Sequence, residues 1–351
     1  MHQTVQMQIP FCKYLKNRKN IGFIFIYSGL LIVIIAAFLG SFKLQRLQMV
    51  VLVNSAEWRA TNEKKEIVEL PFVIELKSFT IDEYPSGKPK CFTSDVTVYL
   101  QNQVIINALI KVNKPLSVAG WKIYQMSYDK TQGKNSTYSV FQLVKDPWLP
   151  AVYTGIFLML AGAVFMLISG LAFNYRNYRK SFIFTILGIV LFAVLIARMW
   201  LSPERTQNLM PALQSIWFVP HIMAYMLAYS ILGVATMHAI YLLIRPKKQL
   251  LFMPLCDSLV YIGTAFLTMG MLIGAIWAKE VWGHYWSWDP KETFALATWL
   301  AYLFYIHFRL IKPAKIRIAI CLLIFAFLML QMCWFGVKYL PALGKSIHIY
   351  R

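Results

Sequence analysis

The chain of 351 residues is 58% hydrophobic and 15% aromatic, whereas only 14% of its residues are charged. This apolar share exceeds that of an ordinary soluble domain and predicts a membrane protein. The formal net charge of +20 would suit a nucleic-acid-binding protein, but the basic residues are distributed as a topology signal and not as a phosphate-binding surface.

Seven apolar runs are each close to the roughly 20 residues that a helix needs to cross a bilayer. They occupy residues 21–39, 151–172, 181–200, 217–244, 255–277, 294–310 and 316–337. With the N-terminus inside, the connections expected on the cytoplasmic side carry Lys and Arg clusters without an acidic residue, which is the positive-inside pattern. The first run has no convincing cleavage pattern and is expected to remain a span. An odd number of spans places the C-terminus outside.

One long polar segment, residues 40–148, separates the tail and first span (1–39) from the multi-span remainder (149–351). Apolar and polar residues alternate at 71–76, 94–100 and 103–110 with many β-branched side chains, which predicts strands. The sequence YPSGKP at 84–89 predicts a turn. We therefore expect one extracytoplasmic, β-rich domain of about a hundred residues, enough for a modest core.

The five cysteines include no C-x-x-C pair. This usage supports neither a disulfide framework nor a zinc site. Cys256, Cys321 and Cys333 fall in or beside apolar runs, where we expect them to act as small hydrophobic residues.

The most unusual stretch is WGHYWSWDPKET at 282–293, between two apolar runs. Trp and Tyr gather at membrane surfaces, which explains one or two of these rings but poorly explains so dense a cluster. The cluster indicates a flat apolar platform for a planar ligand. Asp289, Pro290 and Glu292 also have the spacing of a helix start with an N-cap, an N1 proline and a capping-box glutamate. Both roles stay open for the two carboxylates.

This stretch resembles the tryptophan-rich WWD signature of heme-handling proteins in cytochrome c maturation, in particular the CcsA (ResC) component of System II cytochrome c synthases. The polar segment resembles the outer part of the CcsB (ResB) component. The similar pieces are Phe79 with Tyr84 and Gly87, V-N-x-P-L at 112–116, G-W-x-I-Y-Q at 120–125 and the Asp-Pro pair at 146–147. The resemblance implies a fused CcsB–CcsA-type synthase.

The resemblance also implies roles for three histidines. His221 in a Pro-His pair and His348 beyond Phe-Gly-Val match the contexts of the family's two external heme-ligating histidines; an interfacial histidine that only hydrogen-bonds is the alternative. His307 matches a histidine on the route by which heme enters from inside, and snorkelling beside Arg309 is the alternative. The companion histidine expected in the CcsB part has no counterpart, because none occurs between His2 and His221.

The remaining candidates surround this implied heme site. The expected platform residues are Trp282, Tyr285, Trp286, Trp288 and Asp289. His284 is expected to be a loop residue or a propionate contact, and His238 to be a packing residue. Basic groups pair with carboxylates, so the candidate propionate partners are Arg198, Arg205, Lys279 and Lys338. Arg198 has snorkelling as its alternative.

These residues and the resemblance imply a multi-pass protein of the bacterial cytoplasmic membrane with its active face outside. It would bind heme b, export it and promote its thioether attachment to the C-x-x-C-H segment of an apocytochrome c. No catalytic acid or base is implied, since positioning of vinyl and thiol supplies much of the rate. The implied partners are apocytochrome c, a thioredoxin-like thiol reductant and membrane lipid, and not nucleic acid. The alternatives are a heme exporter or chaperone that serves a separate ligase, and a transporter unrelated to heme.

Overall fold

The computed structural model describes residues 21–101, 104–180, 209–335 and 339, together with single positions between 183 and 198. Within these residues, six helices are long and apolar enough to span a membrane, and a β-rich domain lies between the first and the second. The predicted fold class, a polytopic helical membrane protein with one β-rich domain after its first span, is therefore confirmed. The predicted run 181–200 falls mostly outside the described residues, as do both ends of the chain.

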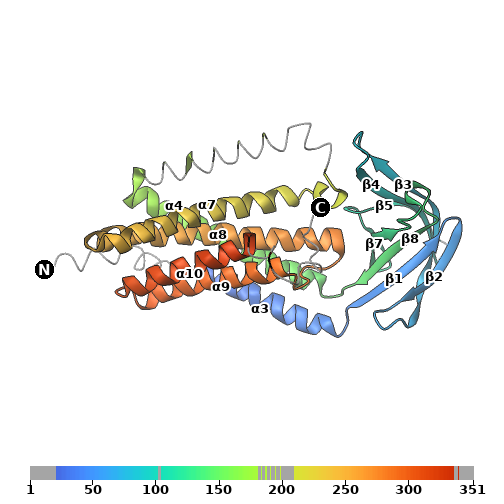
Figure 1. Cartoon of the computed structure of the whole chain (residues 1–351). Helices are drawn as coiled ribbons and strands as arrows, with labels where there is room; N and C mark the ends of the chain where they lie inside the picture. Colours follow the sequence, from blue (N-terminus) through green and yellow to red (C-terminus); the bar gives the residue numbers. More distant parts are fainter. Residues whose placement is uncertain are drawn as a thin grey trace.

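The six helices run side by side and the β domain lies at one end of the bundle (Figure 1). They are α3 (Ile21–Ser41), α4 (Leu149–Asn177), α7 (Phe218–Ile244), α8 (Gln249–Trp282), α9 (Pro290–Ile311) and α10 (Ile316–Trp334). Helical backbone satisfies its own polar groups, which apolar surroundings require. The basic connections that follow α7 and α9 lie at the end of the bundle away from the β domain.

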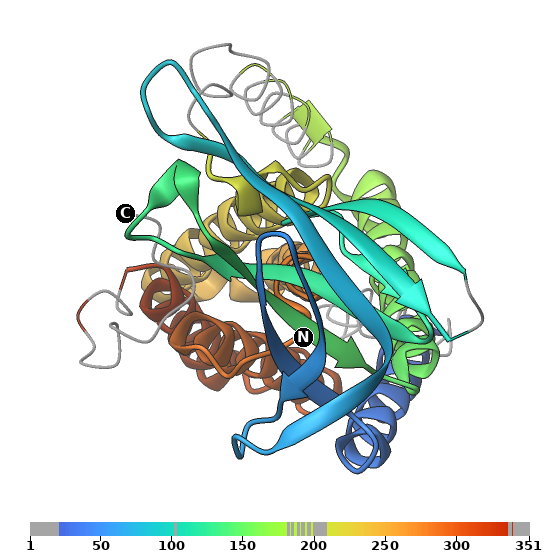
Figure 2. The ribbon, with the colours of Figure 1, turned by 90° about the vertical axis from the view of Figure 1, so that its right-hand side faces the viewer.

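The β domain is a single antiparallel sheet of eight strands in the order β5-β4-β3-β2-β1-β8-β7-β6. The strands are β1 (Gln45–Leu52), β2 (Ser55–Thr61), β3 (Ile67–Glu83), β4 (Pro89–Leu100), β5 (Ile105–Lys111), β6 (Leu116–Val118), β7 (Trp121–Tyr128) and β8 (Tyr138–Lys145). The sheet curls so that β5 contacts β6 and β7, which makes it barrel-like, and it lies across the end of the bundle (Figure 2).

The predicted strands at 71–76, 94–100 and 103–110 correspond to parts of β3, β4 and β5, and the predicted turn joins β3 to β4. The alternation is recovered because the inward side chains of the sheet form one apolar core, which includes Phe72, Ile74, Val96 and Val98. Strand β2 escaped prediction because only one of its residues, Ala60, is buried, so its sequence carries almost no alternating signal.

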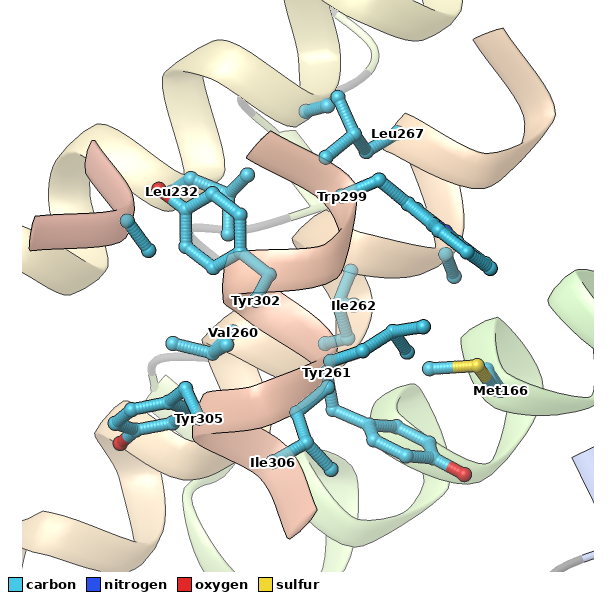
Figure 3. Packing of buried hydrophobic residues seen from close by; sticks show 14 of the residues in the cluster. Met166, Leu232, Val260, Tyr261, Ile262, Leu267, Trp299, Tyr302, Tyr305 and Ile306 are labelled. Atoms are coloured by element: carbon cyan, nitrogen blue, oxygen red, sulfur yellow. The ribbon is translucent and has the colours of Figure 1, made fainter. Parts of the chain in front are cut away.

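The helical bundle has its own apolar core, centred on α8 and its neighbours. Trp299, Tyr302 and Tyr305 of α9 lie among apolar side chains such as Val260 of α8 and Met166 of α4 (Figure 3). All five of these residues are almost completely buried. Helix α8 extends beyond its predicted run of 255–277 at both ends. The apolar run stops at Trp277 because Lys279 and Glu280 are charged, although Lys279 is buried in the structure.

Helices α3 and α4 approach each other at two pairs of glycines. A Cβ added to Gly29 would lie 2.5 Å from the carbonyl oxygen of Gly155, and one added to Gly162 would lie 2.6 Å from the carbonyl oxygen of Gly22. Small residues at such crossings let membrane helices pack closely. This contact joins the helix before the β domain to the helix after it, so it holds both ends of the domain together.

The glycine contact predicts a specific defect. Gly155→Leu should force α3 and α4 apart and lower the free energy of unfolding by about 1–3 kcal/mol, the usual cost of overpacking. Thermal unfolding in detergent measures this change. Val164→Leu on the same helix is the control, because Val164 is exposed and should tolerate the larger side chain. Equal unfolding midpoints for the two variants would contradict the close packing.

Candidate functional site

A cavity of about 360 Å³ lies between α7, α8, α9 and α10, at the end of the bundle that faces the β domain. Its walls are largely apolar and aromatic. His221 from α7, Tyr285 and Trp286 from the tryptophan-rich loop, and Cys333 from α10 all line it. The structure thus brings one predicted ligand and two predicted platform residues into one cavity, although they lie more than 60 positions apart in the chain.

His221 is held in the first turns of α7 by α8. Its Nδ1 lies 2.8 Å from the carbonyl oxygen of Gly270, and because a carbonyl only accepts, Nδ1 is the donor. The ring also lies edge-on against Tyr225 and tilted against Trp277. Gly274 provides the space for this arrangement, since a Cβ at that position would lie 2.5 Å from His221 Cε1. This bond keeps a proton on Nδ1 and fixes the orientation of the ring.

The tryptophan-rich loop connects the end of α8 to the start of α9. Gly283, with φ +76°, caps α8 in the left-handed conformation. Tyr285 and Trp286 then turn into the cavity. Within the described residues, the Tyr285 hydroxyl and Trp286 Nε1 are buried without a hydrogen-bond partner. Burial also raises the pKa of Tyr285, so its hydroxyl stays protonated and can donate to a ligand.

The other three predicted platform residues do not line the cavity. Trp282 packs against Trp277 and lies parallel to the ring of His284. Trp288 is 69% exposed, and its positive φ of 57° places it in a conformation that costs roughly 1–2 kcal/mol in a non-glycine residue. Of the five predicted platform residues, Tyr285 and Trp286 line the cavity.

Asp289 has the capping role that the sequence left open. Its carboxylate accepts from Lys291 N at 2.8 Å, and the Glu292 carboxylate accepts from Asp289 N at 3.2 Å. Together these bonds form the predicted capping box at the start of α9. Glu292 also accepts from Ser287 N at 2.8 Å, so one carboxylate ties the loop to the helix.

The charged groups differ from those expected. Lys291 and Glu292 line the cavity, although Lys291 was not among the predicted propionate partners. Lys279 instead contacts the β domain, and Arg198 is exposed and outside the cavity lining. Arg205, Lys338 and His348 lie outside the described residues. Lys291 was missed because its position in the motif reads equally well as part of a helix start.

Cys333 was predicted to be a packing residue, but it lines the cavity and donates from Sγ to the carbonyl oxygen of Lys291 at 3.5 Å. No sequence signal distinguished it from Cys256, which is fully buried in the bundle core. Only the packing of α10 against the start of α9 separates the two thiols.

His307 lies apart from the cavity, near the end of α9. Its Nδ1 lies 2.8 Å from the carbonyl oxygen of Leu303, so Nδ1 donates and Nε2 accepts from the Tyr27 hydroxyl at 3.0 Å. Tyr27 belongs to α3, within the region that matches the ResB-like family, the part in which the companion histidine was expected. His238 packs elsewhere, between the rings of Tyr241 and Phe252.

Comparison with known proteins places this architecture in a family. Residues 148–343 match the profile of the family described as Cytochrome C assembly protein, and residues 17–138 match the ResB-like family. The chain is 38% identical over 158 residues to the cytochrome c biogenesis protein CcsA of Chlamydomonas reinhardtii, covering 42% of this chain and 44% of that relative. It is 29% identical over 273 residues to CcsA of Cyanophora paradoxa, covering 60% of this chain and 84% of the relative.

A multi-span bundle with a tryptophan-rich loop and a preceding ResB-like β domain defines the class as a membrane protein of cytochrome c biogenesis. The chain belongs to the cytochrome c assembly protein family. Its two matched regions confirm the predicted fused CcsB–CcsA arrangement. The chain spans 44% and 59% of the lengths of two algal CcsA relatives, from Chlamydomonas reinhardtii and Heterosigma akashiwo.

The capping box yields a prediction that needs no ligand. Asp289→Ala should lower the free energy of unfolding by about 1 kcal/mol, because the N-cap acceptor is lost. Asp289→Asn keeps an acceptor oxygen and serves as the matched control. Thermal unfolding in detergent compares the two, and a larger loss for the asparagine variant would contradict the capping role.

Proposed function

We propose that the protein binds heme b in the cavity between α7, α8, α9 and α10 and presents it for attachment to apocytochrome c. One observation carries the proposal: an imidazole oriented by a hydrogen bond from Nδ1 shares an apolar cavity with two buried aromatic donors that have no hydrogen-bond partner among the described residues. Imidazole is a common axial ligand of heme iron. The Tyr285 hydroxyl, Trp286 Nε1 and the Lys291 ammonium suit the polar edge of a porphyrin, and the apolar walls suit its faces.

The hydrogen bond from His221 supports its role as the iron ligand. A ligating histidine usually donates its other ring N–H to a carbonyl or carboxylate, which orients the ring and raises its basicity. His221 makes this bond to Gly270. We propose His348 as the second axial ligand, on the resemblance alone. The apocytochrome histidine would have to replace one of these two ligands.

The attachment step that we propose is an addition. Each cysteine S–H of the C-x-x-C-H segment adds across one heme vinyl group, so that sulfur bonds to one carbon and hydrogen to the other. This step needs no oxidant or reductant, but it requires thiols and not a disulfide, so a thioredoxin-like reductant is the proposed partner. The protein contributes position: it holds the vinyl groups where the thiols can reach them. We propose that this occurs on the extracytoplasmic face of a bacterial cytoplasmic membrane.

Two substitutions test the assignment of His221 as the ligand, one that removes the imidazole and one that displaces it. His221→Ala removes the imidazole, whereas Gly274→Ala keeps it but displaces it through a Cβ that would lie 2.5 Å from the ring. Both should lower the co-purifying heme at least tenfold and change its absorption spectrum. Gly233→Ala is the matched control, since its Cβ would lie 3.6 Å from Phe327, an ordinary contact. Unchanged spectra in both site variants would remove His221 as the ligand.

Co-expression with an apocytochrome c in a host that lacks its own maturation system tests the reaction. The wild-type chain should yield cytochrome with covalently attached heme, which is measured by peroxidase staining on denaturing gels. Bound heme without covalent product would favour the exporter or chaperone alternative. Absence of any Soret-absorbing pigment would favour a transporter unrelated to heme.

We also propose that His307 lies on the route by which heme arrives, with Tyr27 opposite it. The Tyr27 hydroxyl donates to His307 Nε2. An imidazole in place of this phenol would be a stronger ligand for iron. In a His221→Ala background, Tyr27→His should therefore raise the residual heme content, and adding His307→Ala should remove that gain. Absorption spectra measure the heme. A gain that persists without His307 would contradict the pairing.

A further inference from the structure

We infer that the ion pair between Lys279 and Asp146 helps the β domain to hold the cavity-lining loop in place, and that Lys279 is a positioning residue for Tyr285. The inference rests on the proposed function for its heme readout, but its structural part stands alone. Lys279 lies in the last turn of α8 and its side chain is only 3% exposed. Among the described residues that line the cavity, Lys279 does not appear.

The Lys279 ammonium contacts three groups that belong to different parts of the molecule. It lies 3.4 Å from Asp146 Oδ2, it donates to the carbonyl oxygen of Gly283 at 3.1 Å, and it lies 4.8 Å from the centre of the Tyr285 ring. Asp146 belongs to the β domain's exit, whereas Gly283 and Tyr285 belong to the loop. One cation thus joins the β domain to the backbone and to an aromatic ring of the cavity wall.

The Asp146 side chain is itself held by a hydrogen bond, so it provides a fixed position for the Lys279 ammonium. Its Oδ1 accepts from the backbone N–H of Trp148 at 3.1 Å, in the turn between β8 and α4. The carboxylate therefore cannot follow the lysine if the loop moves, because it is bonded to its own backbone. Separation of the pair would leave the buried Lys279 charge without its counter-ion, which opposes movement of the loop away from Asp146.

Packing at Gly283 provides an independent contact between the same two parts. A Cβ added there would lie 3.2 Å from Tyr124 Cε2 and 3.2 Å from Val144 Cγ2. These two residues belong to β7 and β8, so the sheet lies directly against the first residue of the loop. The start of the loop is thus in contact with both the sheet and Lys279, and Tyr285 follows two residues later.

The β domain also holds the segment that leads to His221. Gln214 Nε2 donates to the Tyr84 hydroxyl at 3.1 Å and to the Lys90 carbonyl oxygen at 2.9 Å. Asn113 Nδ2 donates to the carbonyl oxygen of Pro211 at 2.7 Å. The domain therefore contacts the chain just before His221 and again at Gly283, just before Tyr285 and Trp286. A rearrangement of the domain would thus affect the cavity residues of both segments.

Hydrogen exchange on the full-length protein in detergent tests the ion pair without heme. Lys279→Met should speed exchange of the amides at 283–289 by roughly tenfold. Asp146→Asn should speed it less, because Lys279→Met also removes the contacts with Gly283 and Tyr285. The double variant should match Lys279→Met, since Asp146 acts on the loop through Lys279. Lys279→Arg, which keeps the charge and the donors, should restore protection. Lys122→Met is the matched control, since Lys122 lies in the adjacent hollow with Asp146 but is not within salt-bridge distance of it.

Titration with hemin supplies the second readout. Lys279→Met should shift the absorption maximum of bound heme and weaken binding at least threefold, while Lys279→Arg and Lys122→Met should match the wild type. Unchanged exchange at 283–289 in Lys279→Met, or an equal change in Lys122→Met, would overturn the positioning role. If the wild type binds no hemin but the exchange pattern is as expected, the proposed function fails while the ion pair keeps its role in ordering the loop.

Discussion

Helix α8 carries a buried charge near each end, and the ion pairs of these charges constrain how the rest of the molecule is assembled. Near its start, Asp257 accepts from Arg309 of α9 through contacts of 2.7 to 3.1 Å and from the Tyr305 hydroxyl at 2.7 Å. In its last turn, Lys279 meets Asp146. A buried pair contributes little net stability compared with apolar packing, but a broken pair leaves an uncompensated charge. The two pairs therefore act against any shift of α8 along α9 or away from the β domain.

The cavity depends on this register of α8. His221 can lie against α8 only where Gly270 offers a carbonyl and Gly274 offers space. A displacement of α8 by one residue would place a side chain in the imidazole's position. The same helix ends at Gly283, from which the loop turns Tyr285 and Trp286 into the cavity. Position along one helix thus sets both the histidine wall and the aromatic wall.

The β domain contacts the helical bundle at several places. It enters from α3 and leaves into α4, and these helices are held together by close glycine contacts. It then contacts the segment before α7 and the loop after α8. A domain fixed at four places cannot rotate freely over the bundle. Fusion of the ResB-like and cytochrome c assembly regions in one chain fits this geometry, because the cavity walls are formed by one region and supported by the other.

Local patterns in the sequence were sufficient for the helices that span the membrane, for strands such as β3 and β4 and for the start of α9. Each of these depends on hydrophobic periodicity, on length or on capping chemistry within a few residues. The tryptophan-rich stretch likewise identified the family and the end of the bundle where the cavity lies.

Tertiary structure alone decided which members of that stretch line the cavity. Tyr285 and Trp286 do so, and Trp288 does not, in a loop that contains two residues with left-handed backbone, Gly283 and Trp288. Composition reports that aromatic rings are present but not where their side chains point. It was likewise packing between distant helices that brought Tyr27 to His307 and Asp146 to Lys279, since contacts between residues more than a hundred positions apart leave no periodic signal in the sequence.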